Sequence, residues 1–97
     1  MISVPTVSVC MITYGHEKTI EQAILGVLAQ DCDFTFELLV ANDCSPDATD
    51  AIIQSLLATH PKAACVRYIR NAENRGMMPN FISTLTQCNG RYIALCD

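Results

Sequence analysis

Positive charge is scarce in this chain, and charged residues of either sign are few. Six Lys and Arg stand against ten Asp and Glu, the formal net charge is −4 at pH 7, and only 16% of the 97 residues are charged. No basic patch is present to follow a phosphate backbone, so we expect no nucleic-acid partner. A small anionic ligand would need local help from a helix N-terminus, an arginine or a divalent ion.

The common glycine-rich and nucleophile motifs are also missing. The sequence contains neither G-x-x-x-x-G-K-[ST] nor G-x-G-x-x-G, so the standard phosphate-binding loops are absent. It contains no G-x-S-x-G, which removes the nucleophile elbow of the α/β-hydrolases.

Export and metal-binding signals are lacking as well. Residues 1–5 carry no basic segment followed by a long apolar core, so we expect no signal peptide, and no apolar run is long enough to span a membrane. The six cysteines form no C-x-x-C pair and no His-rich cluster. We therefore predict a cytoplasmic protein whose cysteines are buried or half-buried free thiols.

What the chain does have is apolar sequence, at 51% of its residues, arranged in alternating strand-like and helix-like segments. Strands are predicted at residues 7–12, 37–41, 65–70 and 91–96. Helices are predicted at residues 17–30, 45–60 and 79–88. In the second helix Ser45 is the expected N-cap, Pro46 takes the first helical position and His60 stands at the end. Gly90 is the expected C-cap of the third helix. In the third helix we expect Phe81, Ile82 and Leu85 to face inward.

This βαβαβαβ order predicts a parallel sheet with right-handed crossovers in an α/β fold. The length allows at most one small domain. Strands covered on both faces are continuous apolar runs, as these are, so we expect three layers, α/β/α.

Two carboxylates follow apolar strands directly. Asp43 comes after the strand at 37–41 and Asp97 after the strand at 91–96. Ligands of open parallel sheets bind outside the carboxyl ends of the strands. Asp43 could accept a hydrogen bond from a base or a ribose, or it could cap the following turn. Asp97 fits a metal or sugar contact, although one carboxylate rarely holds Mg²⁺ without further ligands.

Other polar residues fall at the same predicted edge. Tyr14 could stack on a base or pack over the first helix, and Arg75 could fork onto a phosphate or lie solvated beside the turn at Gly76. We expect His16 to be a surface or turn residue and Glu17 to begin the first helix, where its charge favours the helix dipole.

Four segments in order resemble the N-terminal half of the family 2 inverting glycosyltransferases, which have the Rossmann-like GT-A fold. Residues 7–14 are similar to the strand-one motif that ends in Pro-Thr-Tyr-Asn, with Ile12 for the proline and Gly15 for the asparagine. Residues 39–49 resemble Val-Asp-Asp-Gly-Ser-x-Asp-x-Thr, with Asn42 for the first aspartate and Cys44 for the glycine. Residues 74–80 resemble the Asn-x-Gly loop, and residues 90–97 resemble the strand that leads to the Asp-x-Asp motif. The resemblance implies a sheet order of 3-2-1-4.

The resemblance also implies a site for a nucleotide-sugar donor, of the UDP-sugar type. Thr13 and Tyr14 would line the nucleotide pocket, and Glu17 matches a glutamate common after that motif. Asp43 would bind the pyrimidine ring, and Arg75 would lie by the base or the diphosphate. Asp97 would be the first aspartate of the metal motif, near the ribose and a Mg²⁺ or Mn²⁺ ion.

In this family the second metal-motif aspartate, the acceptor-binding half and the catalytic base follow that motif. We therefore expect residues 1–97 to form a single partial domain, truncated at the metal motif, with an incomplete metal site and no catalytic residue. The implied parent is a hexosyltransferase-type enzyme that transfers sugar to an acceptor hydroxyl with inversion, in polysaccharide or cell-surface glycan synthesis. Attachment of that parent to the inner face of the cell membrane stays open.

Three alternatives compete with this interpretation. A sugar nucleotidyltransferase would carry a glycine-rich phosphate loop where this chain has residues 13–17. A flavodoxin-like receiver would carry an acidic pair where Thr13 and Tyr14 stand, and an aspartate where Asn71 stands. A non-catalytic nucleotide-binding remnant that folds only with a partner stays open. We also expect the last strand to form an open sheet edge that invites self-association.

Overall fold

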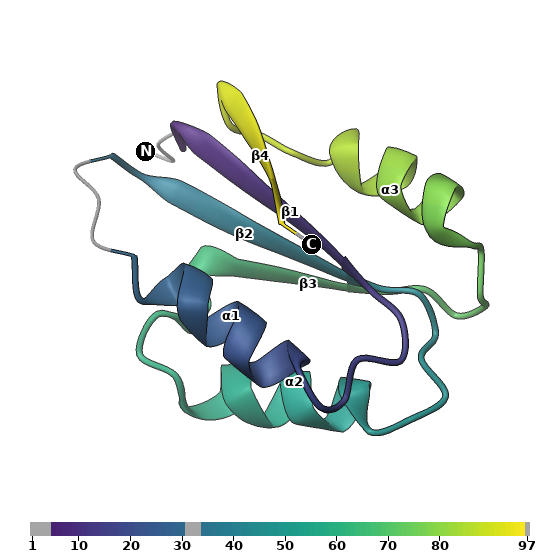
Figure 1. The fold of residues 1–97 in the computed structure, drawn as a ribbon. Helices are drawn as coiled ribbons and strands as arrows, with labels where there is room; N and C mark the ends of the chain where they lie inside the picture. The colour runs from purple at the N-terminus through teal and green to yellow at the C-terminus, as the bar shows by residue number, and fades with distance from the viewer. Residues whose placement is uncertain (1–4, 31–33, 97) are drawn as a thin grey trace.

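The fold is a four-stranded parallel sheet with helices on both faces (Figure 1). The computed structural model describes residues 5–30 and 34–96. The elements in chain order are β1 (Val7–Thr13), α1 (Ile20–Leu28), β2 (Phe36–Asn42), α2 (Thr49–Thr59), the 3₁₀ turn η1 (Ala63–Cys65), β3 (Val66–Arg70), α3 (Met77–Leu85) and β4 (Tyr92–Cys96). The sheet order β3-β2-β1-β4 confirms the predicted topology.

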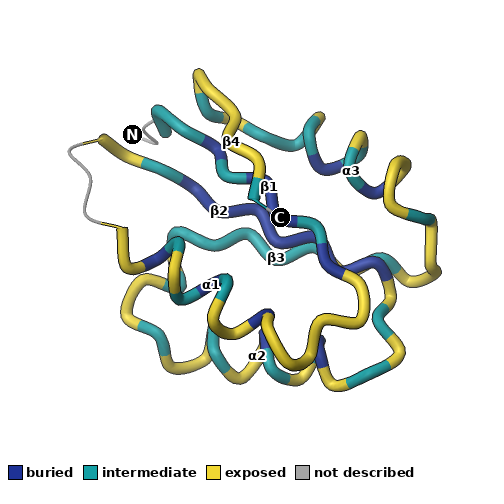
Figure 2. The backbone as a smooth tube through the Cα atoms, in the orientation of Figure 1, coloured by how far each residue is buried: buried dark blue, intermediate teal, exposed yellow. Residues whose placement is uncertain are grey.

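The main apolar core lies between the sheet and the pair α1 and α2 (Figure 1). Side chains alternate between the two faces along a strand, so every second residue of β1 and β2 points into this layer. Its buried members are Met11, Ile20, Ile24, Leu28, Leu38, Val40 and Ile53. Figure 2 shows the resulting dark band along the two central strands. The continuous apolar runs of the sequence are thus explained by central strands buried on both faces.

The opposite face, under α3, is more polar. Ser8 and Glu37 are paired across β1 and β2, and the Ser8 hydroxyl donates to Glu37 Oε2 at 2.5 Å. Glu37 also accepts from the Asn89 amide at 2.7 Å and from Arg67 Nη1 at 3.3 Å. Burial raises the pKa of Glu37, but these hydrogen bonds outweigh it and hold the pKa below its ordinary value. The carboxylate thereby fixes the chain segment that leads into β4.

Helix α3 differs from the prediction in its bounds and in its buried face. It begins at Met77 instead of residue 79 and ends at Leu85 instead of residue 88. Its buried residues are Asn80 and Thr84, whereas Ile82 is 54% exposed. The prediction that Ile82 faces inward was wrong, because this helix packs over the polar face of the sheet.

The starts of the other helices also differ from the prediction. Helix α1 begins at Ile20, three residues after Glu17, and α2 begins at Thr49, after a turn that contains Ser45 and Pro46. Ser45 is therefore not the N-cap of α2. The N-cap position is Ala48, and the side chain of Asp47 accepts from the Thr49 amide at 3.0 Å in the turn just before the helix.

Gly90 has a different function from the predicted helix cap. Its amide donates to the Ser8 hydroxyl at 2.7 Å, and a Cβ built on it would lie 2.5 Å from the backbone nitrogen of Ser8. Glycine is required at this position because the backbone approaches β1 too closely for a side chain.

The cysteines of the described residues are free thiols. Burial, together with the neighbouring Cys88, raises the pKa of Cys10 to about 11, so this thiol is protonated and unreactive at neutral pH. Cys44 is exposed, contrary to the prediction of buried or half-buried thiols. Within the described residues, no helix is long and apolar enough to cross a membrane.

Replacing Gly90 with Ala is expected to destabilise the fold by about 1–3 kcal/mol, because the new methyl group overlaps the backbone of β1. Urea denaturation of the chain measures this change. Gly26 in α1 is the matched control, because nothing lies within 4 Å of a Cβ there, and Gly26→Ala should stabilise the helix by up to ~1 kcal/mol. Equal stability of the Gly90→Ala variant and the wild type would contradict the close approach.

The apolar side chains of β4 are expected to promote self-association of the chain. This strand forms one edge of the sheet, and Tyr92, Ile93 and Leu95 are 68%, 47% and 64% exposed. A lysine on an edge strand opposes pairing with another chain, so Leu95→Lys should shift the mass in sedimentation equilibrium toward the monomer. Met78→Lys changes an exposed residue away from this edge and is the control. A monomeric wild type with a sharp cooperative melt would count against this prediction.

Candidate functional site

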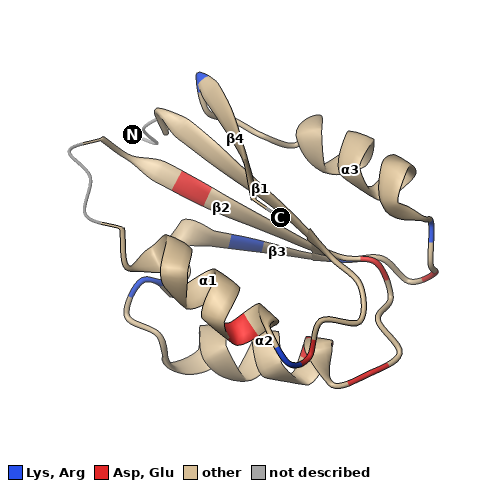
Figure 3. Cartoon of the chain, in the orientation of Figure 1, with Lys and Arg blue, Asp and Glu red and all other residues tan. Residues whose placement is uncertain are grey.

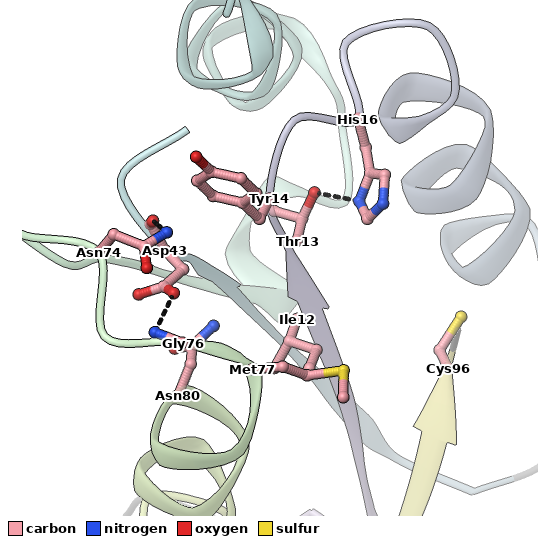
Figure 4. Close-up of a pocket in the computed structure, with 10 residues that line it drawn as sticks. All are labelled: Ile12, Thr13, Tyr14, His16, Asp43, Asn74, Gly76, Met77, Asn80 and Cys96. Atoms are coloured by element: carbon pink, nitrogen blue, oxygen red, sulfur yellow. Dashed lines mark hydrogen bonds between the residues drawn. The ribbon is translucent and has the colours of Figure 1, made fainter. Parts of the chain in front are cut away.

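A cavity of about 600 Å³ opens at the carboxyl ends of β1, β2 and β4, beside the start of α3 (Figure 4). Its volume is in the range of small-molecule binding sites. The lining residues come from all four motif segments and are Ile12, Thr13, Tyr14, His16, Asp43, Asn74, Gly76, Met77, Asn80 and Cys96. The sheet edge predicted from the sequence is thus the edge that carries the cavity.

The Asp43 carboxylate accepts three hydrogen bonds at this edge. Its Oδ1 accepts from the Arg75 amide and from Asn71 Nδ2, both at 2.9 Å, and its Oδ2 accepts from the Gly76 amide at 2.8 Å. Its backbone carbonyl accepts from Asn74 Nδ2 at 3.3 Å. The carboxylate that ends β2 therefore clamps the loop between β3 and α3.

This clamp requires the ionised form of Asp43. The residue is 3% exposed, and burial raises the pKa of its carboxyl group. Hydrogen bonds from the Arg75 amide, the Asn71 side chain and the Gly76 amide outweigh burial and lower the pKa below its ordinary value. Asp43 is thus a charged acceptor at neutral pH.

Two asparagines extend the clamp to the sheet and to α3. Asn71 Nδ2 also contacts Asn80 Oδ1 at 3.0 Å, and Asn80 Nδ2 donates to the carbonyl of Ala41 at 3.2 Å. Asn80 is 2% exposed. A polar residue on the inner face of α3 is therefore explained, because it ties the helix start to the end of β2.

Glu17 and Asp47 join the loop between β1 and α1 to the loop between β2 and α2. Glu17 Oε2 accepts from the Ala48 amide at 3.0 Å, and Asp47 Oδ2 accepts from the Glu17 amide at 3.3 Å. The hydroxyl of Thr49 accepts from the His16 amide at 3.1 Å. Glu17 thus contacts the start of α2 instead of beginning α1, and it is not among the described residues that line the cavity.

Asn42, which stands where the family motif has its first aspartate, is used within the fold. Its Oδ1 accepts from the Ser45 hydroxyl at 2.6 Å, and its Nδ2 donates to the Tyr68 hydroxyl at 2.9 Å. The Tyr68 hydroxyl in turn donates to Asp50 Oδ1 at 2.7 Å. Burial raises the pKa of Tyr68 to about 12, which keeps this hydroxyl protonated. Asn42 therefore holds the β2–α2 loop through Ser45, and it is not among the described residues that line the cavity.

Two of the four departures from the family motifs, Gly15 and Cys44, fall at left-handed backbone positions. Cys44 has φ 60° and Gly15 has φ 68°. Glycine or asparagine is favoured at such positions, which explains the glycine of the family motif where Cys44 stands. The two loops are held together there by the Gly15 amide, which donates to the Ser45 hydroxyl at 3.0 Å.

The structure brings three of the predicted site residues together in the cavity wall. Thr13 and Asp43 are buried, and Tyr14 is 50% exposed beside them (Figure 4). Arg75 contributes its backbone amide to the clamp, while its exposed side chain is not among the described lining groups. Asp97 lies outside the described residues.

The sequence interpretation missed several members of the site. It treated His16 as a turn residue and did not consider Asn71, Asn80 or Met77 as site residues, although His16, Asn80 and Met77 line the cavity. Asn71 could have been found, because it follows β3 directly at the same sheet edge. Asn80 could not be recognised by periodicity, since a helix is expected to bury apolar residues.

The described residues do not form a metal site by themselves. Residues 5–30 and 34–96 contain no group of three or more His, Cys, Asp and Glu side chains that could hold an ion. Charged residues are absent from β1, β4 and α3, three of the elements around the cavity (Figure 3).

Loss of the Asp43 carboxylate is expected to reduce both stability and its dependence on acid. A lowered native pKa means that the contribution is complete above the unfolded value of about 4 and is lost as the pH falls through the native value. Asp43→Asn should lower the free energy of unfolding at neutral pH by about 1–3 kcal/mol, because donors lose their acceptor. It should also flatten the decline in stability below about pH 4, measured by urea denaturation across pH.

The exposed Glu73 in the same loop provides the control, as Glu73→Gln removes a charge without disturbing the clamp. An unchanged acid dependence in Asp43→Asn would contradict the clamp.

Comparison with known proteins identifies the family. The model of glycosyl transferase family 2 matches residues 8–97. The succinoglycan biosynthesis protein ExoO of Rhizobium meliloti is 35% identical over 94 residues, which cover 97% of this chain and 25% of that protein. The putative glycosyltransferase EpsE of Bacillus subtilis is 31% identical over 97 residues, covering 100% and 34%. The uncharacterized protein Rv1520 of Mycobacterium tuberculosis is 37% identical over 90 residues, covering 93% and 25%. This chain thus spans between a quarter and about a third of these relatives.

Solved structures agree with this result. S. aureus TarS 1-349 in complex with UDP has a TM-score of 0.78 and 26% identity, over 95% of this chain and 27% of that one. The mannosyltransferase PcManGT from Pyrobaculum calidifontis, in complex with GDP-Man and Mn²⁺, has a TM-score of 0.79 over 94% and 26%, and at 23% identity it supports the fold alone. The sheet and its helices have the GT-A architecture, and the chain belongs to glycosyl transferase family 2.

Proposed function

We propose that this chain forms the donor-binding part of a hexosyltransferase-type glycosyltransferase that uses a nucleotide sugar. The observation that carries the proposal is the convergence of four family-motif segments, far apart in sequence, on one cavity at the carboxyl edge of the sheet. Such an edge is where open α/β sheets bind nucleotides.

Asp43, Tyr14 and Asn74 supply groups that suit a pyrimidine base. Asp43 accepts three hydrogen bonds from the protein, and an ionised carboxylate has about four acceptor positions, so one position is available to a base N–H. Tyr14 is half exposed on the cavity wall and offers an aromatic face for stacking. Arg75 is next to this end of the cavity and could reach the base or the diphosphate.

Among nucleotide sugars we propose a UDP-sugar as the donor. The support is the 26% identical TarS structure, which is a complex with UDP. The relative named for succinoglycan biosynthesis supports a role in polysaccharide or cell-surface glycan synthesis. Transfer with inversion to an acceptor hydroxyl, and work in the cytoplasm or at the inner face of the membrane, follow from the resemblance described above.

A Mg²⁺ or Mn²⁺ ion at Asp97 stays a prediction. The support for a metal is the Mn²⁺ named with the mannosyltransferase neighbour, while the described residues of this chain supply no ligand cluster. The described residues bind and orient the nucleotide, and we expect the 97-residue chain to bind donor without transferring sugar.

Nucleotide binding is tested by calorimetric titration of UDP into the wild type and the Tyr14→Ala variant. We expect the wild type to bind UDP and the variant to bind it roughly tenfold more weakly, because stacking contributes about 1–3 kcal/mol per base. Tyr92, which is 68% exposed in β4 and lies outside the described cavity lining, is the matched control, and Tyr92→Ala should bind like the wild type.

A chain that is folded by circular dichroism and binds no UDP would overturn the UDP-sugar proposal. Sugar transfer by the 97-residue chain would overturn the expectation that it binds without catalysis.

A further inference from the structure

His16 lies at the opposite end of the cavity from Asp43. Figure 4 shows Asp43 with Asn74 and Gly76 on one side, and His16 with Cys96 on the other. Tyr14 lies between these ends on the wall. A ligand that contacts Asp43 with one end therefore extends toward His16 with the other.

His16 is held by one contact to its ring and two to its backbone. Nδ1 lies 2.8 Å from the hydroxyl of Thr13, and the backbone amide donates to the Thr49 hydroxyl at 3.1 Å. The backbone carbonyl accepts from the Ile20 amide at 2.9 Å, which fixes the residue against the first turn of α1. The side chain itself is exposed to solvent and can be reached by a ligand.

The contact with Thr13 fits either neutral tautomer of the ring, and the one in which the hydroxyl donates makes Nε2 a donor. When the Thr13 hydroxyl donates to Nδ1, the proton of a neutral imidazole resides on Nε2. In the charged ring both nitrogens carry protons, so Nε2 is a donor there as well. Nε2 is the ring nitrogen that Thr13 does not occupy, and it is available to the cavity.

The side chains that line the cavity favour an anion at the His16 end, while the exposed side chain of Arg75, near the Asp43 end, is not among the described lining groups. Among the described residues that line it, His16 is the one side chain able to carry a positive charge, and Asp43 is the ionised acid. A phosphate group next to Asp43 would be repelled, whereas one next to His16 gains a hydrogen-bond donor.

We propose that His16 Nε2 donates a hydrogen bond to the diphosphate of the nucleotide and so selects nucleoside diphosphates over nucleosides. The proposal rests on the proposed function, since it assumes that the base lies at the Asp43 end. Thr13 is the positioning residue, because its hydroxyl orients the imidazole. No bond is made or broken in this role.

The test is calorimetric titration of uridine, UMP and UDP, without divalent ions, into the wild type and His16→Ala. We expect the variant to lose roughly tenfold in affinity for UDP, as hydrogen bonds to charged groups are worth that much or more. Affinity for uridine should change by less than about twofold, since the base end is untouched. His16→Gln keeps an N–H donor and should recover part of the loss.

His60→Gln is the matched control. This histidine follows α2, accepts from the Lys62 amide at 2.9 Å and lies outside the described cavity lining. All three ligands should bind this variant as they bind the wild type. A second readout, which does not depend on the folding of any variant, is the ¹⁵N shift of His16 Nε2 in the wild type. It should move on addition of UDP and not on addition of uridine.

The outcomes separate the two proposals. Equal losses for uridine and UDP, or an Nε2 shift that uridine also produces, would overturn the role of His16 in diphosphate selection and leave the proposed function standing. An unchanged UDP affinity in His16→Ala would do the same. A folded wild type that binds neither uridine nor UDP would overturn both.

Discussion

The ionised carboxylate of Asp43 is the interaction on which the rest of the site depends. It ends β2, yet its three donors all come from the segment that links β3 to α3. A buried acid is costly unless hydrogen bonds replace its water, and here the backbone amides of Arg75 and Gly76 do so. The loop therefore has its shape because the acid is charged, and the acid stays charged because the loop surrounds it.

The same need to pair buried polar groups explains why α3 buries polar residues. The face of the sheet beneath it contains Ser8 and Glu37, and the start of the helix also meets the backbone carbonyl of Ala41. Asn80 donates to that carbonyl, while Ile82 and the methionines at the helix start remain exposed. Many residues of α3 and β4 are exposed (Figure 2). The side of the sheet under α3 is therefore less completely covered than the side under α1 and α2.

The order of strands and helices could be predicted from the sequence because each apolar run forms a strand and the turns between them have their own signals. The parallel sheet, its order and its edge all followed from that alternation and from the family resemblance. The helix starts could not be predicted, because Ser45 and Glu17 are good local capping residues whose side chains are recruited by neighbouring loops. Tertiary hydrogen bonds override local preference wherever two loops meet.

The residues of the site that could be predicted are those at or directly after the end of a strand. Thr13 ends β1, Tyr14 and Asp43 directly follow β1 and β2, and all three line the cavity. The position of His16 instead depends on how the β1–α1 loop is held by the Thr49 hydroxyl. A residue three positions beyond a strand end can point anywhere until that loop is fixed.

Asp43 differs from Tyr14 and His16 in one further respect. Its removal changes the wall and the ligand contact together, since the adjacent loop between β3 and α3 loses its acceptor. Tyr14 and His16 project from a loop that other residues hold. Replacing either side chain can therefore change the affinity for a ligand without changing the shape of the cavity.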